Sequence, residues 1–250
     1  MNKMKTWFPV LITSIVFLLL WEAIVILFAI ETWLLPSPYD ILRETWEIRD
    51  RIFENLRSTF TISIFGLMSG LVLGVGIATV LYLIPFLQRI FYPFILISQN
   101  IPLIALAPLL VMWFGFGVGP KITIVMLICF FPIVVSTLDG FTQTDPTLQT
   151  YLKMAGASRW QRFIKLEWPS ALPSFFSGLK LSATYSVMGA VISEWLGSQK
   201  GLGVLLTLSS KSFRTDRVFV AITFIVILSI CFFIIISWIE RFILHWKQNP

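Results

Sequence analysis

The chain has 250 residues, of which 57% are hydrophobic and 13% charged, with a formal net charge of +6. This composition and a mean hydropathy of +0.86 exclude a water-soluble globular domain and predict an all-α integral membrane protein. The basic residues are spread over many connecting segments instead of forming one stripe. We therefore expect lipid headgroups, and not nucleic acid, as their counter-charge.

Six runs are apolar enough to be membrane helices, because a bilayer core needs about 20 apolar residues per helix. They are Pro9 to Ile30, Phe60 to Ile84, Phe91 to Phe114, Ile122 to Leu138, Phe175 to Leu196 and Val218 to Ile239. No small-residue cleavage site follows the first run, so we expect it to remain in the mature protein. Lysine and arginine are balanced between the loops of the two sides, so charge does not fix the orientation.

A charged connector follows the first run. After the turn at Pro36-Ser37-Pro38, the segment Ile41 to Asn55 has apolar residues at helical spacing among acids and arginines, which predicts a surface helix. We therefore divide the chain into residues 1–55, the first membrane helix with its external connector, and residues 56–250, a membrane core.

The second run carries glycines at four-residue spacing. Gly66, Gly70 and Gly74 would form a smooth groove along one helix face, which lets another helix approach closely in lipid. Glycine is also simply common in membrane helices. The partner helix could belong to this chain or to a second copy.

The third run contains two prolines. Asn100-Ile101-Pro102 and Pro108 predict that its helix kinks or breaks. Backbone groups freed by a break must be satisfied by neighbours or by a water-lined cavity. Gln99 and Asn100 are therefore candidate residues of a transport pathway.

The fifth run ends in an acid. Glu194 at the end of a membrane helix is costly unless it faces a cavity or a partner, which makes it a candidate pathway or gate residue. The alternative is that it anchors a loop at the outer boundary. Helical spacing places Tyr185 and Met188 on one side and Ser193 on a small, polar-tolerant face, and these three residues are further pathway candidates.

The segment Asp145 to Pro173 is polar and lies between apolar runs. Asp145 is suited to be a helix N-cap, Gly156 to stop that helix, and Ser158 with Gln161 has the spacing of a capping box. We therefore predict two short helices with a tight corner at Gly156. The pattern is compatible with an amphipathic hairpin at a membrane surface and equally with a solvated basic loop.

This segment resembles the cytoplasmic signature loop of binding-protein-dependent ABC importer permeases. Gly156 and Leu166-Glu167-Trp168-Pro169 match the family pattern, whereas Thr150-Tyr151-Leu152 stands where the family has Glu-Ala-Ala. The resemblance implies an ATPase-coupling hairpin within residues 139–173. Its coupling surface would comprise Leu152, Met154, Ala155, Gly156, Ala157, Ser158, Arg159, Trp160 and Pro169.

The resemblance also implies a type I importer architecture with about six membrane helices, placed in the cell membrane with both termini in the cytoplasm. Its partners would be ABC ATPase subunits, an extracytoplasmic substrate-binding protein and a second copy of the chain. The sequence has no nucleotide-binding motif, so ATP and Mg would be bound by the ATPase, and we expect no cofactor on this chain.

The fifth run looks most like permeases for thiamine precursors of the hydroxymethylpyrimidine type, transported by alternating access. Riboflavin, aliphatic sulfonates, taurine and nitrate are alternative substrates within the same family. A stand-alone secondary transporter would need coupling-ion ligands and usually a repeated half, and neither is evident. An intramembrane enzyme would need a catalytic partner for Glu194, and none is evident either.

Overall fold

The computed structural model describes residues 3–245, and all regular structure in that range is helical. In chain order the elements are α1 (Lys3–Leu27), α2 (Pro38–Glu47), α3 (Arg49–Leu83), α4 (Pro85–Ser98), α5 (Leu103–Phe114), α6 (Val118–Thr142), α7 (Pro146–Met154), α8 (Arg159–Arg162), the π-helical turn η1 (Phe163–Glu167), α9 (Trp168–Glu194), α10 (Leu202–Lys211) and α11 (Thr215–Ile243). The prediction of an all-α fold is confirmed. The outermost residues of the two predicted regions, 1–2 and 246–250, lie outside the described residues.

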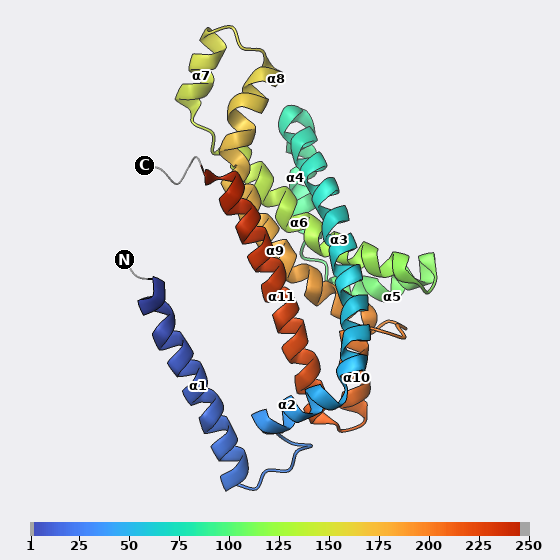
Figure 1. Cartoon of the computed structure of the whole chain (residues 1–250). Coiled ribbons are helices and arrows are strands. Elements are labelled where there is room, and N and C mark those ends of the chain that lie inside the picture. Colours follow the sequence, from blue (N-terminus) through green and yellow to red (C-terminus); the bar gives the residue numbers. More distant parts are fainter. Residues whose placement is uncertain (1–2, 246–250) are drawn as a thin grey trace.

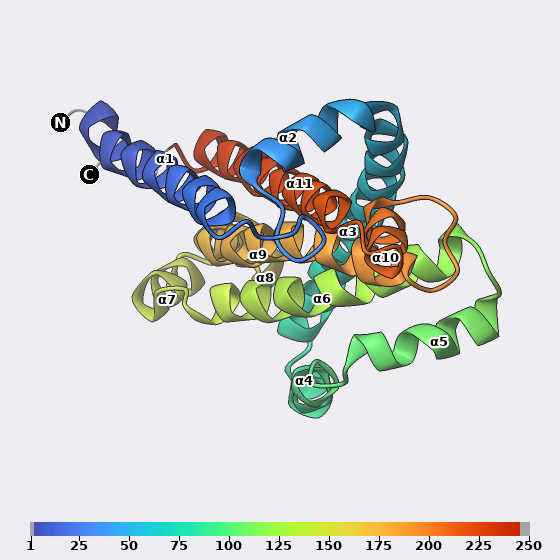
Figure 2. The ribbon, with the colours of Figure 1, turned by 90° about the horizontal axis from the view of Figure 1, so that it is seen from below.

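Within residues 3–245, four helical segments are long and apolar enough to cross a membrane: α3, α6, the continuous segment 159–194 and α11. Helix α6 lies at the centre and packs against α3 and α9, and α11 packs against the outer side of α9 (Figure 1). The first predicted run falls in α1, which stands apart from this bundle in both ribbon views (Figure 2). Helix α1 touches the bundle at its lower end, where the Trp21 and Phe219 ring centroids are 5.5 Å apart.

The third predicted run is interrupted, as Pro102 led us to expect. Helix α4 ends at Ser98 and α5 begins at Leu103, so the run is two short helices instead of one continuous span. Asn100 Nδ2 donates to the Leu96 carbonyl oxygen over 2.8 Å and so satisfies one of the freed acceptors at the end of α4.

The spaced glycines of α3 lie in its contact with α6. A Cβ atom added at Gly66 would overlap Val125, and one at Gly70 would lie 2.8 Å from Cys129 Cβ. One at Gly74 would lie 2.8 Å from Ile133 Cγ2. The three glycines thus bring α3 against a helix of the same chain, at a separation that no larger residue allows.

Small residues also set the contact of α6 with α9. A Cβ atom at Gly178 would lie 2.6 Å from Ser136 Cβ, and one at Gly189 would lie 2.7 Å from Ile128 Cδ1. Helices α3, α6 and α9 are therefore held at close range by small residues on two separate interfaces.

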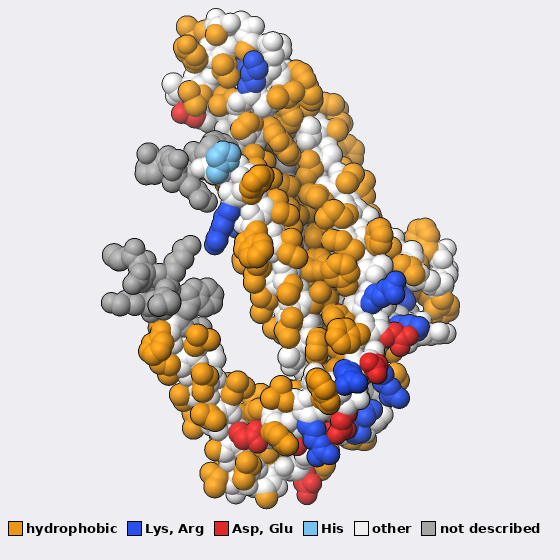
Figure 3. Space-filling model, viewed as in Figure 1, with side chains coloured by type: hydrophobic (Ala, Val, Ile, Leu, Met, Phe, Trp, Pro, Cys, Tyr) orange, Lys and Arg blue, Asp and Glu red, His pale blue; other side chains and the backbone are white. Residues whose placement is uncertain are grey.

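The two ends of the bundle differ in polarity. Hydrophobic side chains cover the length of the helices, whereas most charged side chains in view gather around α2 and the adjoining ends of α3 and α11 (Figure 3). Helices α7 and α8 lie at the opposite end, toward which α11 also runs (Figure 1). We call these the α2–α10 end and the hairpin end.

The connector is shorter than predicted. Ser37 caps α2 through a capping box with Asp40, and α2 ends at Glu47. Helix α3 begins at Arg49 and passes residue 55 without a break, so the predicted boundary at residue 55 falls inside α3. Glu44 attaches the connector to the start of α11. It is buried and pairs with Arg217 at 2.6 Å and with Arg214 at 2.9 Å.

Candidate coupling hairpin and transport pathway

The polar segment forms the helical corner that its capping residues predict. The Asp145 carboxylate accepts from the Thr147 backbone N–H over 2.7 Å and caps α7, and this hydrogen bond lowers the pKa of Asp145 below its ordinary value. Ser158 Oγ accepts from the Gln161 N–H over 3.2 Å, and Gln161 Oε1 accepts from the Ser158 N–H over 2.8 Å. The corner between them has Gly156 at φ +81°, which is a left-handed conformation that glycine adopts without strain.

The predicted coupling residues lie on the outer surface of this corner. Met154 is 83% exposed and Trp160 57%, and Tyr151, which was not among the predicted residues, is 68% exposed beside them. Four more of the predicted residues are also exposed: Ala155, Gly156, Ser158 and Arg159. Three are partly exposed: Leu152, Ala157 and Pro169, the last of which lies outside the corner in the first turn of α9. The corner therefore presents an apolar patch that no described residue of the chain covers.

An aromatic cluster joins the hairpin to the bundle. Trp160 stacks on Phe163 with ring centroids 5.5 Å apart, and Phe163 lies 5.3 Å from Phe141 of α6. Phe141 also lies 4.8 Å from Tyr82 at the end of α3 and 5.7 Å from Trp168 at the start of α9. Three membrane helices thus meet the hairpin through one packed group of rings.

The second hairpin helix is not a separate short helix, contrary to the prediction. Residues 159–194 form one uninterrupted helical segment, in which the π-helical turn Phe163–Glu167 ends two residues before Pro169. Since proline has no N–H to donate to the preceding turn, a wide turn at this point loses no hydrogen bond. Pro169 and Pro173, which precede the predicted membrane run Phe175 to Leu196, are accommodated in the first turns of α9.

The pathway candidates of the fifth run divide between two environments. Tyr185 and Met188 are exposed on one side of α9, together with Leu181. Ser193 is fully buried and its Oγ donates to the Ala190 carbonyl oxygen over 2.7 Å, so it does not share their exposed side.

Glu194 faces a turn of the chain instead of open space. Its carboxylate is 1% exposed, and Oε1 accepts from Thr59 Oγ1 of α3 over 2.8 Å. Oε2 accepts from the Gly203 N–H at the start of α10, also over 2.8 Å. Beside them, Asn55 Oδ1 accepts from the Gly201 N–H over 2.7 Å. We use the name carboxylate cradle for this group of five residues: Glu194, Thr59, Gly203, Asn55 and Gly201.

The remaining pathway candidates lie elsewhere. Gln99 and Asn100 are exposed at the break between α4 and α5. Helix α6 lies between this arm and α9 (Figure 2), so one copy of the chain does not bring them together with Tyr185 and Met188.

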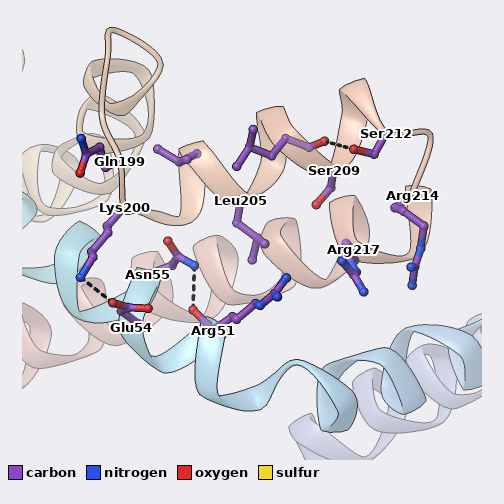
Figure 4. Close-up of a pocket in the computed structure, with 12 residues that line it drawn as sticks. Arg51, Glu54, Asn55, Gln199, Lys200, Leu205, Ser209, Ser212, Arg214 and Arg217 are labelled. Atoms are coloured by element: carbon purple, nitrogen blue, oxygen red, sulfur yellow. Dashed lines mark hydrogen bonds and ion pairs between the residues drawn. The ribbon is translucent and has the colours of Figure 1, made fainter.

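Sequence reasoning missed the partners of Glu194 and a recess beside them. The recess, about 480 Å³ in volume, lies at the α2–α10 end between α3, α10 and the start of α11 (Figure 4). Arg51, Lys200, Arg214 and Arg217 line it, and Lys200 pairs with Glu54 at 2.6 Å. The Gly201-Leu202-Gly203 sequence was a signal of a tight turn here, but nothing local pointed to Thr59.

Comparisons with known proteins agree with this architecture. The family described as "Binding-protein-dependent transport system inner membrane component" matches residues 70–245. The formylaminopyrimidine transport permease protein ThiX of Halalkalibacterium halodurans is 35% identical over 220 residues, which are 88% of each chain. The riboflavin transport system permease protein RibX of Chloroflexus aurantiacus is 28% identical over 95% of this chain and 90% of its own.

Solved structures show the same fold. A chain of an amino acid ABC transporter crystallised with histidines has a TM-score of 0.67 at 14% identity, covering 79% of this chain and 96% of that one. A chain of the inward-facing MetNI methionine ABC transporter has a TM-score of 0.63 at 20% identity over the same shares. These comparisons confirm the predicted importer-permease fold, and the chain belongs to the family of binding-protein-dependent transport system inner membrane components.

Proposed function

We propose that this permease imports a small pyrimidine precursor of thiamine by alternating access, driven by ATP that a separate subunit hydrolyses. The observation that carries the proposal is the uncovered hairpin corner that continues without interruption into the membrane helix α9. The substrate class is supported by the 35% identity with a permease named for formylaminopyrimidine.

The hairpin corner is the proposed seat of the ATPase. Tyr151, Met154 and Trp160 leave an apolar patch open at the hairpin end, and such patches are typical of protein interaction sites. Lys153 and Arg159 beside it can meet acidic side chains of the partner. ATP and Mg are bound by that partner, and the hairpin end faces the cytoplasm with both termini.

A second copy of the chain completes the proposed pathway. The exposed side of α9 and the projecting α4–α5 arm are apolar faces on opposite sides of α6, and a second copy that covers one face would bring its own residues to the other. Tyr185 can stack on a pyrimidine ring, while Met188, Gln99 and Asn100 are further lining residues. An external binding protein would deliver the substrate to the α2–α10 end.

The proposal is tested by uptake in cells that lack only this chain. Labelled formylaminopyrimidine and hydroxymethylpyrimidine are supplied, and the deletion is complemented with the wild-type chain or with Tyr185→Ala. Phe17 of α1, 63% exposed on a helix that stands apart from the bundle, provides the control Phe17→Ala. We expect uptake only when a complementing gene is present. Among the complementing chains, only Tyr185→Ala should give reduced uptake.

Uptake that is independent of the chain would refute the pyrimidine assignment. Unlabelled riboflavin, an aliphatic sulfonate, taurine and nitrate serve as competitors in the same assay. If one of these competitors lowers uptake at concentrations at which unlabelled pyrimidines do not, the substrate is reassigned to that compound and the importer role stays intact.

A further inference from the structure

The carboxylate cradle joins three helices through one buried carboxyl group. Glu194 is the last residue of α9, Thr59 lies about three turns from the start of α3, and Gly203 is in the first turn of α10. Each Glu194 oxygen accepts one hydrogen bond of 2.8 Å, from the Thr59 hydroxyl and from the Gly203 N–H. A buried polar group that loses its hydrogen-bond partner costs the full desolvation penalty of that group.

The direction of each hydrogen bond in the cradle is fixed. The Leu202 N–H donates to Thr59 Oγ1 over 2.8 Å, so the hydroxyl hydrogen is left to donate. The Asn55 backbone carbonyl oxygen at 3.2 Å is the only other acceptor near that hydrogen among the described residues, and Glu194 Oε1 is closer at 2.8 Å. The Gly203 N–H can only donate. Both cradle donors therefore require an acceptor at Glu194, which a carboxylate supplies on both atoms and an amide on only one.

The turn at Gly201-Leu202-Gly203 packs against the Glu194 carboxylate without free space for a larger residue. A Cβ atom at Gly201, where φ is +137°, would overlap the Glu194 carboxylate, and one at Gly203 would lie 2.5 Å from the Val191 carbonyl oxygen. The start of α10 is thus packed backbone against side chain on the end of α9. A displacement of that end must move the first turn of α10 with it or break the cradle.

The opposite end of the same helical segment is the hairpin corner. Residues 159–194 form one helix of 36 residues, which at about 1.5 Å per residue is about 54 Å long. Its first residues, Arg159 and Trp160, belong to the proposed ATPase seat, and its last residue is Glu194. Helix α10 in turn supplies Leu205 and Ser209 to the wall of the recess (Figure 4).

We infer that Glu194 is a positioning residue that fastens α10 to the end of this helix, so that movement of the hairpin by the ATPase reshapes the recess wall that faces the binding protein. The inference rests on the proposed function for the two partners. It assigns to Glu194 a role in coupling ATP hydrolysis to substrate delivery and not in contacting the substrate.

The test uses the complete transporter, with its ATPase and binding protein, in proteoliposomes supplied with ATP. Glu194→Gln presents an NH₂ group to one of the two cradle donors, and Thr59→Val removes the hydroxyl with little change of shape. Thr59→Ser keeps the hydroxyl and is the matched control. ATP hydrolysis and uptake of labelled formylaminopyrimidine are measured on the same preparations.

We expect Glu194→Gln and Thr59→Val to lower the amount of substrate imported per ATP by about tenfold, because leaving a buried hydrogen-bonding group without its partner changes an equilibrium by roughly that factor. Thr59→Ser should match the wild type. A purely structural role would lower hydrolysis and uptake in parallel through loss of protein, and this result would overturn the inference, as would unchanged uptake per ATP in both cradle variants. If Glu194→Gln does not assemble, Thr59→Val decides.

Hydrogen exchange separates this inference from the proposed substrate. In the wild-type complex, adding a non-hydrolysable ATP analogue should change the exchange of the Leu205 and Ser209 amides at the recess wall, and Glu194→Gln should abolish the change. If the wild type hydrolyses ATP without importing a pyrimidine, the substrate proposal fails while this exchange result still supports the coupling role. Amides that do not respond to the nucleotide in the wild type would overturn it.

Discussion

Replacing Gly70 by alanine tests the packing on which the bundle depends. The added Cβ would lie 2.8 Å from Cys129 Cβ and 2.9 Å from the Met126 carbonyl oxygen, both on α6. Ordinary carbon contacts are about 3.5–4.0 Å, and a backbone oxygen cannot rotate away. Helices α3 and α6 must therefore separate, at an overpacking cost of about 1–3 kcal/mol.

Gly76→Ala is the matched control, because it makes the same chemical change on the same helix with nothing within 4 Å of the new Cβ. Alanine favours helix over glycine by up to about 1 kcal/mol, and this gain is common to both variants. Their difference in stability thus isolates the overpacking, which for a chain of this size corresponds to a difference in Tm of a few degrees up to about 10 °C.

The assay is thermal unfolding of both purified variants in the same detergent, followed by tryptophan fluorescence. We expect Gly70→Ala to unfold at a lower temperature than the wild type and Gly76→Ala at the same temperature or higher. Equal Tm values for the two variants would refute the conclusion that the glycines of α3 set its distance from α6.

Three further changes address the hairpin and the charged pairs. Gly156→Leu should leave the protein in the membrane but abolish uptake, because φ +81° is strained for leucine. Gly156→Asn should retain uptake, because asparagine tolerates that conformation. Transport by the leucine variant would exclude this corner as the coupling surface. Arg217→Met should lower stability by about 1–3 kcal/mol in thermal unfolding, since buried Glu44 loses its 2.6 Å partner, and an unchanged Tm would show that the pair does not hold α2 to α11. Lys180→Met should lower stability by a similar amount, about 1–3 kcal/mol, because it leaves Glu240 without its partner at 2.8 Å. Adding Glu240→Gln to this variant should restore part of the lost stability. Additive losses in the double variant would contradict this pairing of α9 with α11.

Features set by neighbouring residues could be predicted from the sequence. The cap at Asp145, the capping box at Ser158 and the break before Pro102 each depend on hydrogen bonds within four residues, and the structure has all three. The spacing of the glycines predicted a helix contact because the period of an α-helix places them on one face.

Features that depend on distant residues could not be predicted. The surroundings of Glu194 depend on Thr59, 135 positions earlier, and the sequence therefore left open whether the acid lines a pathway or anchors a loop. The continuous helix from Arg159 was missed because the apolar run begins only at Phe175, whereas a π-helical turn before Pro169 lets the helix extend from the polar segment into that run. Lys180 is a charge inside the apolar run Phe175 to Leu196, and only the structure supplies Glu240 as its partner.

ATP-dependent transport by the purified chain tests the central claim most directly. Proteoliposomes containing this chain and its ATPase, with the binding protein and labelled formylaminopyrimidine on the opposite side from ATP, are compared with proteoliposomes that lack only the ATPase. We predict accumulation of the label against its gradient that requires ATP, the ATPase and the binding protein together. Accumulation without the ATPase, driven instead by an ion gradient, would contradict the account.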